Sequence, residues 1–157
     1  MELTILQWIF QSIPECLALS SFAVVVSNHK LDLKMVLLIG LPQAIAVYLV
    51  RLLPITFGVH FIILIVVLAV NLNLQLKIKF GRSLLTALVA LIILAAAEIA
   101  FITLILSVTG NTFEQVSQNN LLLIFYGLPQ TIFLFLLAIS VYRWKRKPDA
   151  IKEGYDA

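Results

Sequence analysis

Two glutamates and two glutamines lie in the middle of apolar segments, where polar side chains are costly. Glu15, Gln43, Glu98 and Gln130 each stand near the centre of a separate apolar stretch. A carboxylate at the centre of a bilayer costs at least about 2.5 kcal/mol, so such groups are expected to face polar partners inside a helix bundle. The pattern predicts carboxyl–amide hydrogen bonds between helices around a shared polar cavity.

A short motif recurs around three of these residues. A small residue, an aliphatic residue and a proline precede Glu or Gln in Ser12-Ile13-Pro14-Glu15, Gly40-Leu41-Pro42-Gln43 and Gly127-Leu128-Pro129-Gln130. A proline inside a helix frees the carbonyl four residues earlier, and a small residue lets two helices approach closely. The motif therefore supports a cavity lined by freed carbonyls, amides and carboxyls. The simpler alternative is that these groups serve packing alone.

Other polar side chains extend the same faces. Gln11 precedes Glu15 by one helical turn, Tyr126 precedes Gln130 likewise, and Tyr48 and Arg51 lie on the Gln43 side of their helix. These four residues complete the predicted ligand-binding set. Arg51 lies about 12 Å along its helix from Gln43, at eight residues of 1.5 Å rise, where an anionic ligand would meet it. The simpler alternative for Arg51 is a side chain that reaches into the interface.

The elements that position these residues are five apolar stretches. The chain is 62% hydrophobic and only 12% charged, with a mean hydropathy of +1.07. About a quarter of a soluble domain is charged, so lipid is the expected solvent. Backbone groups in lipid must pair within the segment, which requires helices. We predict an all-α membrane protein, a single bundle over residues 1–142 with transmembrane helices at 3–26, 35–53, 59–76, 84–108 and 121–142.

Short polar segments set the predicted boundaries. Asp32 is expected to help start the second helix, and Gly58 to end a tight turn before the third. Residues 77–82 separate the third and fourth helices. The spacing of Thr112 and Gln115 fits a capping box, which predicts a short helix in the longest loop.

The charges predict the orientation of the bundle. With five spans, ten of the eleven Lys and Arg residues fall on one side, and Arg51 alone falls on the other. The positive-inside rule then puts the N-terminus outside and the basic tail, residues 143–157, in the cytoplasm. Trp144 is expected to anchor the last span at the inner interface. We expect a multi-pass protein of a bacterial cytoplasmic membrane.

Several classes of function are not supported by the sequence. No aromatic-interleaved basic groove suggests nucleic acid, and His29 and His60 lie at different helix ends, so no metal site is expected. No nucleophile motif or phosphate-binding loop is present, and Cys16 has no histidine at its depth. We therefore expect neither an enzyme nor a cofactor. The first apolar stretch lacks a positive start and a clear cleavage site, so it is predicted to be a helix and not a signal peptide.

The run from Leu49 to His60 (LVRLLPITFGVH), together with Ser12-Ile13-Pro14-Glu15, resembles the membrane region of bacterial sensor histidine kinases. The kinases in question are of the accessory-gene-regulator and sporulation-kinase type. The resemblance implies a polytopic sensor domain, which in those kinases precedes a GHKL-type ATPase domain. Because this sequence ends shortly after its last predicted span, we expect a stand-alone module without phosphoacceptor or ATPase domain. Such a module would act through a homo-oligomer or through a membrane or cytoplasmic signalling partner.

Three functions are consistent with these observations. The first is a sensor or regulatory module that binds a small ligand or peptide from the outer side. The second is a small transporter or substrate-binding subunit of vitamin-uptake type, because midplane carboxyls and proline-broken helices are typical of transporters. The third is a structural or assembly subunit of a membrane complex.

Overall fold

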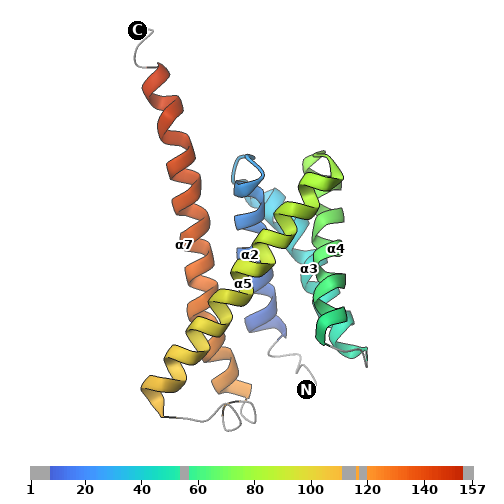
Figure 1. The fold of residues 1–157 in the computed structure, drawn as a ribbon, viewed down its shortest axis with the longest axis vertical. Coiled ribbons are helices and arrows are strands. Elements are labelled where there is room, and N and C mark those ends of the chain that lie inside the picture. Colours follow the sequence, from blue (N-terminus) through green and yellow to red (C-terminus); the bar gives the residue numbers. More distant parts are fainter. Residues whose placement is uncertain (1–7, 54–56, 111–115, 117–119, 154–157) are drawn as a thin grey trace.

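A computed structural model describes residues 8–53, 57–110, 116 and 120–153, and the regular elements within them are all helices. Within these residues, five helices are long and apolar enough to cross a membrane, which confirms the predicted number of spans. Figure 1 shows them as one bundle of helices that alternate in direction. Their bounds are η1 Trp8–Ser12 continuing into α2 Ile13–Val26, then α3 Leu33–Leu52, α4 Phe57–Leu76, α5 Phe80–Thr109 and α7 Asn120–Glu153.

The ends of the helices follow from particular side chains and from one glycine. Asp32 caps α3 as predicted, because its Oδ1 accepts the backbone N–H of Lys34 at 3.2 Å. Gly110 ends α5 with a φ of 69°, a left-handed conformation that glycine adopts without strain. Asn73 donates from Nδ2 to the carbonyl of Ile78, just beyond α4. Asn73 thus holds the short connection between α4 and α5.

Three helices begin two to four residues earlier than the sequence predicted, and α3 is the first of them, at Leu33. α4 begins at Phe57, so Gly58 lies in its first turn and not in the preceding loop. α5 begins at Phe80, so Gly81 and Arg82 also belong to the helix. The start of a helix does not have to coincide with the boundary of the lipid, because a long basic side chain such as that of Arg82 can reach water from a position inside the helix.

The last helix is longer than its membrane-crossing part. α7 continues to Glu153, so most of the predicted basic tail prolongs the helix of the last span. Lys and Arg are good helix formers, which favours continuation of the helix past the interface. The predicted capping box at Thr112 and Gln115 lies outside the described residues.

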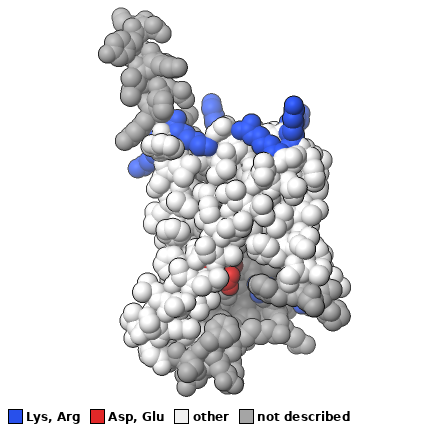
Figure 2. All heavy atoms as spheres, in the orientation of Figure 1, with Lys and Arg blue, Asp and Glu red and all other residues white. Residues whose placement is uncertain are grey.

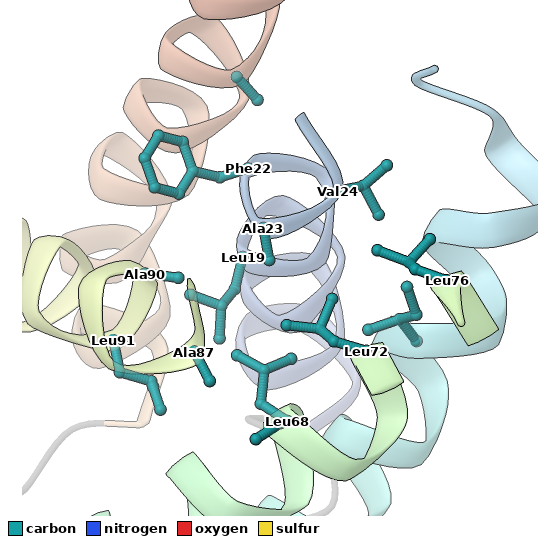
Figure 3. Packing of buried hydrophobic residues seen from close by; sticks show 13 residues of the cluster. Leu19, Phe22, Ala23, Val24, Leu68, Leu72, Leu76, Ala87, Ala90 and Leu91 are labelled. Carbon is teal, nitrogen blue, oxygen red and sulfur yellow. The ribbon is translucent and has the colours of Figure 1, made fainter. Parts of the chain in front are cut away.

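The first span lies at the centre of the bundle. α2 packs against α3, α5 and α7, and its side chains from Ala18 to Val25 are all buried. In Figure 3, Leu19 of α2, Leu72 of α4 and Ala87 of α5 meet in one apolar cluster. Helices in lipid associate largely by close van der Waals packing, which small residues such as Ala87 permit.

The direction of α5 divides the bundle into an apolar half and a polar half. α5 crosses the bundle diagonally, from contact with α4 near its start to a position beside α7 near its end (Figure 1). The apolar cluster uses the first part of α5 and the C-terminal halves of α2 and α4, so it fills one half. Glu15, Glu98 and Gln130 lie toward the other ends of their helices. The diagonal helix therefore closes the apolar half more tightly than the polar half.

Lys and Arg side chains gather along one end of the bundle (Figure 2). This basic end is formed by the α2–α3 connection, the α4–α5 connection and the end of the membrane-crossing part of α7, with Arg143 and Lys145. Arg51 lies in the last turn of α3, at the opposite end. The charge asymmetry of the sequence is thus also an asymmetry of the folded protein.

Lys145 has a structural role that its position in a basic run does not reveal. Its Nζ donates to the carbonyl of Val25 at 3.0 Å, to that of Val26 at 3.3 Å and to Oδ1 of Asn28. The last carbonyls of a helix have no intrahelical donor and carry partial negative charge. Lys145 therefore caps the C-terminus of α2 and ties it to α7.

Replacing Lys145 by methionine should lower the free energy of unfolding by about 1 kcal/mol, because the α2 carbonyls lose a charged donor. The measurement is thermal unfolding of the purified protein in detergent micelles. Lys79→Met is the matched control, since Lys79 is exposed at the same basic end and makes no side-chain cap. Equal unfolding temperatures for both variants would contradict the capping role.

Candidate functional site

Glu15 and Gln130 form a carboxyl–amide hydrogen bond between helices. Glu15 stands in the first turn of α2, directly after the π-helical turn η1 and Pro14. Proline is tolerated at the start of a helix, where its missing N–H would have no partner. Gln130 of α7 donates from Nε2 to Oε1 of Glu15 at 3.0 Å, and its side chain is only 1% exposed. The bond therefore joins α2 and α7 inside the bundle.

Gln43 finds a different partner from the one expected. Its Nε2 donates to the backbone carbonyl of Leu64 at 3.2 Å, and the side chain is 1% exposed. The sequence suggested a carboxylate as the acceptor. No partner was expected on α4, because the side chains at its centre are apolar. A backbone carbonyl can accept a second hydrogen bond whatever its side chain is, so α4 contributes to the polar layer through its main chain.

The two glutamine side chains each keep one unused acceptor. Oε1 of Gln43 and Oε1 of Gln130 are buried and have no hydrogen-bond partner in the part of the chain that the structure describes. The amides are not simply reversed, because Nε2 of each already faces an acceptor, a carboxylate oxygen or a carbonyl. An unsatisfied buried polar atom costs about 1–3 kcal/mol, which a ligand or a water molecule that donates to it would recover.

Glu98 lies at the surface of the bundle and not in its closed core. Its side chain is exposed, and Figure 2 shows acidic atoms at the surface of the half that lies away from the basic end. The charge of Glu98 is close enough to interact with Glu15 and with Arg51. Arg51, itself exposed, also acts on Glu15. Two acidic groups and one basic group thus share one region of the polar half.

Comparisons with protein-family models, with curated proteins and with solved structures found no match for this chain. The chemistry of the site therefore follows from its own groups. Carboxylates and amide oxygens accept hydrogen bonds and attract cations, and carboxyl groups can also exchange protons. The arrangement can hold a ligand that carries N–H or O–H donors, with Arg51 nearby for an acidic group.

The small residues of the repeated motif bring the helices together at this layer. A Cβ added to Gly40 would lie 2.8 Å from the Leu17 side chain and 2.9 Å from that of Ser20, both on α2. A Cβ added to Gly127 would lie 2.5 Å from Nε2 of Gln11. Ser12, the small residue of the third copy, is itself buried. The predicted close approach is confirmed, and in both glycine cases the partner is the first span.

The remaining predicted residues are placed around the same layer with partners of their own. Gln11 packs on Gly127, and the hydroxyl of Tyr126 lies 2.9 Å from Oγ1 of Thr109. The ring of Tyr48 contacts that of Trp8, with centroids 5.3 Å apart. These side chains thus support the walls of the site, while Oε1 of Gln43 and Oε1 of Gln130 are the buried acceptors without a partner among its described residues.

Trp8 is a residue of the site region that the sequence did not single out. Its Nε1 donates to the carbonyl of Ala44 at 2.8 Å, next to Gln43 on α3. Together with the Tyr48 contact, this bond fastens η1 to α3. A signal existed in the sequence, since a tryptophan near a helix end commonly needs a partner for its N–H.

Proposed function

We propose that this protein is a membrane sensor or regulatory module that binds a small ligand in the polar half of the bundle and acts through a partner. The observation that carries the proposal is that two buried glutamines keep unpartnered oxygens, Gln130 bonded to the Glu15 carboxyl and Gln43 bonded to the main chain of α4. Buried groups that need donors, close to the exposed carboxyl of Glu98, suit a ligand that supplies those donors. The kinase-like run from Leu49 to His60 supports a sensory role.

The chemistry of the site favours a ligand with an amino group. Two carboxyls and two amide oxygens outnumber the donors that remain there, so an ammonium group matches the site best. Arg51, at the end of α3, would meet a carboxylate on the same ligand. An amino acid or a short peptide has both groups, and this ligand class fits the proposed sensor.

The direction of access follows from the charges. The positive-inside rule puts the basic end in the cytoplasm of a bacterial cell, so the N-terminus and the polar half would face outward. A ligand would then enter from outside, and the helical extension of α7 would present the signal to a cytoplasmic partner or to a second copy.

The proposal is tested by thermal unfolding in detergent with a panel of amino acids, dipeptides and polyamines, and with dicarboxylic acids that lack an amino group. At least one amine should raise the unfolding temperature in proportion to its occupancy, whereas the dicarboxylic acids should not. The double variant Glu15→Gln, Gln43→Leu should abolish the shift, because it removes a charge and an acceptor while residue 15 still accepts from Gln130.

Gln75→Leu is the matched control, since Gln75 lies at the other end of α4, in the basic half. It should keep the full response. If no amine stabilised the protein, or if the double variant responded like the unaltered chain, the sensor proposal would fail.

Transport is the second candidate, and the shape of the spans favours it. The first span is interrupted by the π-helical turn before Pro14, and Pro42 lies inside α3. Interrupted helices with midplane carboxyls are typical of secondary transporters. Uptake of a panel compound into proteoliposomes, lost in Glu15→Gln or Glu98→Gln, would support transport over sensing. A structural subunit is favoured instead if alanine at each of the four midplane positions leaves cellular function intact.

A further inference from the structure

A second hollow lies in the basic half of the bundle, away from the polar site. It is a groove of about 350 Å³, which is in the range of small-molecule sites. Its floor is α2, and its walls are the start of α3 and the middle of α7. The lining is almost wholly apolar and consists of Leu17, Ser21, Leu31, Leu33, Val36, Leu37, Phe135, Ala138 and Ile139.

The one hydroxyl of the lining does not make the groove polar. Oγ of Ser21 donates to the carbonyl of Leu17 in its own helix at 2.8 Å, and the residue is 4% exposed. The groove therefore offers van der Waals contact and no free donor. An apolar occupant is required, and in a membrane the candidates are an acyl chain or another helix.

The groove is short. On α2 its lining runs from Leu17 to Ser21, which is four residues or about 6 Å at 1.5 Å per residue. The depth and the volume therefore fit an acyl chain and a short stretch of helix equally well, and the charge at the mouth of the groove decides between them.

The mouth of the groove is positively charged. Lys30 and Lys34 flank the lining residues at the start of α3, with Asp32 between them. Arg143 follows Ile139 by one helical turn on α7, and it is exposed. These groups carry two net positive charges.

Two further features of the mouth add to this charge. Lys145, two residues after Arg143, reaches from α7 to the end of α2, where its Nζ lies 3.0 Å from the Val25 carbonyl. The first backbone N–H groups of α3 contribute partial positive charge at the same end. The mouth therefore attracts an anion, and the helix end adds to lysine and arginine side chains that are already there.

We propose that this groove binds one anionic phospholipid, with an acyl chain between α3 and α7 and its phosphate at Lys30, Lys34 and Arg143. The lipid would fill a wedge between two helices that both pack on α2, and would hold their separation. This inference is independent of the proposed sensor function, because the groove and the polar site lie in opposite halves of the bundle.

The test is native mass spectrometry of the full chain, released from micelles that contain equal amounts of phosphatidylglycerol and phosphatidylcholine. One phosphatidylglycerol should be retained, with at least a tenfold preference over phosphatidylcholine. Lys30→Gln with Lys34→Gln should remove the preference, whereas Lys77→Gln with Lys79→Gln, at the same end, should keep it. All four side chains are exposed, so these variants do not threaten the fold.

Filling the groove with larger side chains gives a second, separate test of the proposal. Leu37→Trp with Ile139→Trp should lower lipid retention at least tenfold, and the control Val66→Trp with Ile92→Trp, on lipid-facing positions of α4 and α5, should not. Equal retention of the two lipids, or full retention in the lysine variants, would overturn the proposal. A dimer that the groove tryptophans dissociate would overturn it too, since the occupant would then be a second copy of the chain.

Discussion

Replacing Gly40 by leucine should lower the free energy of unfolding by about 2–3 kcal/mol, because the new side chain has no room between α3 and α2. The first carbon alone would lie 2.8 Å from Cδ2 of Leu17 and 3.2 Å from the backbone carbonyl of Cys16. A side chain can turn away from such a contact, but the main chain of the central helix cannot. The two helices would have to separate.

The same substitution also threatens a hydrogen bond. Oγ of Ser20, 2.9 Å from the position of the added carbon, donates to the carbonyl of Val36 across the α2–α3 contact at 3.1 Å. Alanine at position 40 should therefore already cost about 1 kcal/mol, through displacement of Ser20.

Gly81→Ala is the matched control for Gly40→Ala. No atom lies within 4 Å of a Cβ added to Gly81, which is in the first turn of α5. Alanine there should be neutral or should stabilise the helix by up to about 1 kcal/mol, because glycine loses more backbone freedom on folding. Gly40→Leu, Gly40→Ala and Gly81→Ala are all compared with the unaltered protein by thermal unfolding in detergent micelles. If Gly40→Leu unfolded at the temperature of the unaltered protein, the close contact would be wrong.

Close approach at Gly40 was predictable because it depends on the size of one residue in a repeated motif. The helical fold and the number of spans were predictable for a related reason, since lipid leaves the backbone no other way to pair. The helix boundaries were less predictable. Gly81 and Arg82 are residues typical of a loop, yet they belong to α5. Composition does not report whether a helix stops at the interface or passes through it.

The partners of the buried polar groups were only partly predictable. A carboxyl–amide bond between spans was expected from depth alone, and Glu15 with Gln130 is such a bond. The acceptor for Gln43 was not predictable, because every residue has a backbone carbonyl and the sequence does not show that the one of Leu64 would be used. The diagonal course of α5 was also not encoded in any single residue, and neither was the exposure of Glu98, which the sequence placed in the interior of the bundle.

Removing the amide of Gln130 with methionine should lower the free energy of unfolding by about 2 kcal/mol. Hydrogen bonds between membrane helices are worth up to about 1.7 kcal/mol, and the loss is larger here because a carboxyl group is left without its donor. Gln75→Met, the same substitution at the end of α4 in the basic half, should cost less than 0.5 kcal/mol. Unfolding in detergent micelles measures both.

A double-mutant cycle separates the bond from the loss of either side chain. Glu15→Met alone also breaks the pair, but Glu15→Met combined with Gln130→Met leaves no unpaired carboxyl, so the double variant should be less destabilised than the sum of the two. Glu15→Gln should cost the least, because its carbonyl oxygen still accepts from Gln130. Additive effects in the cycle would mean that the two groups do not interact, and the polar layer would then lose the contact that joins α2 to α7. The proposed ligand site depends on this contact, since only a fixed Gln130 amide keeps its free oxygen in place for a donor.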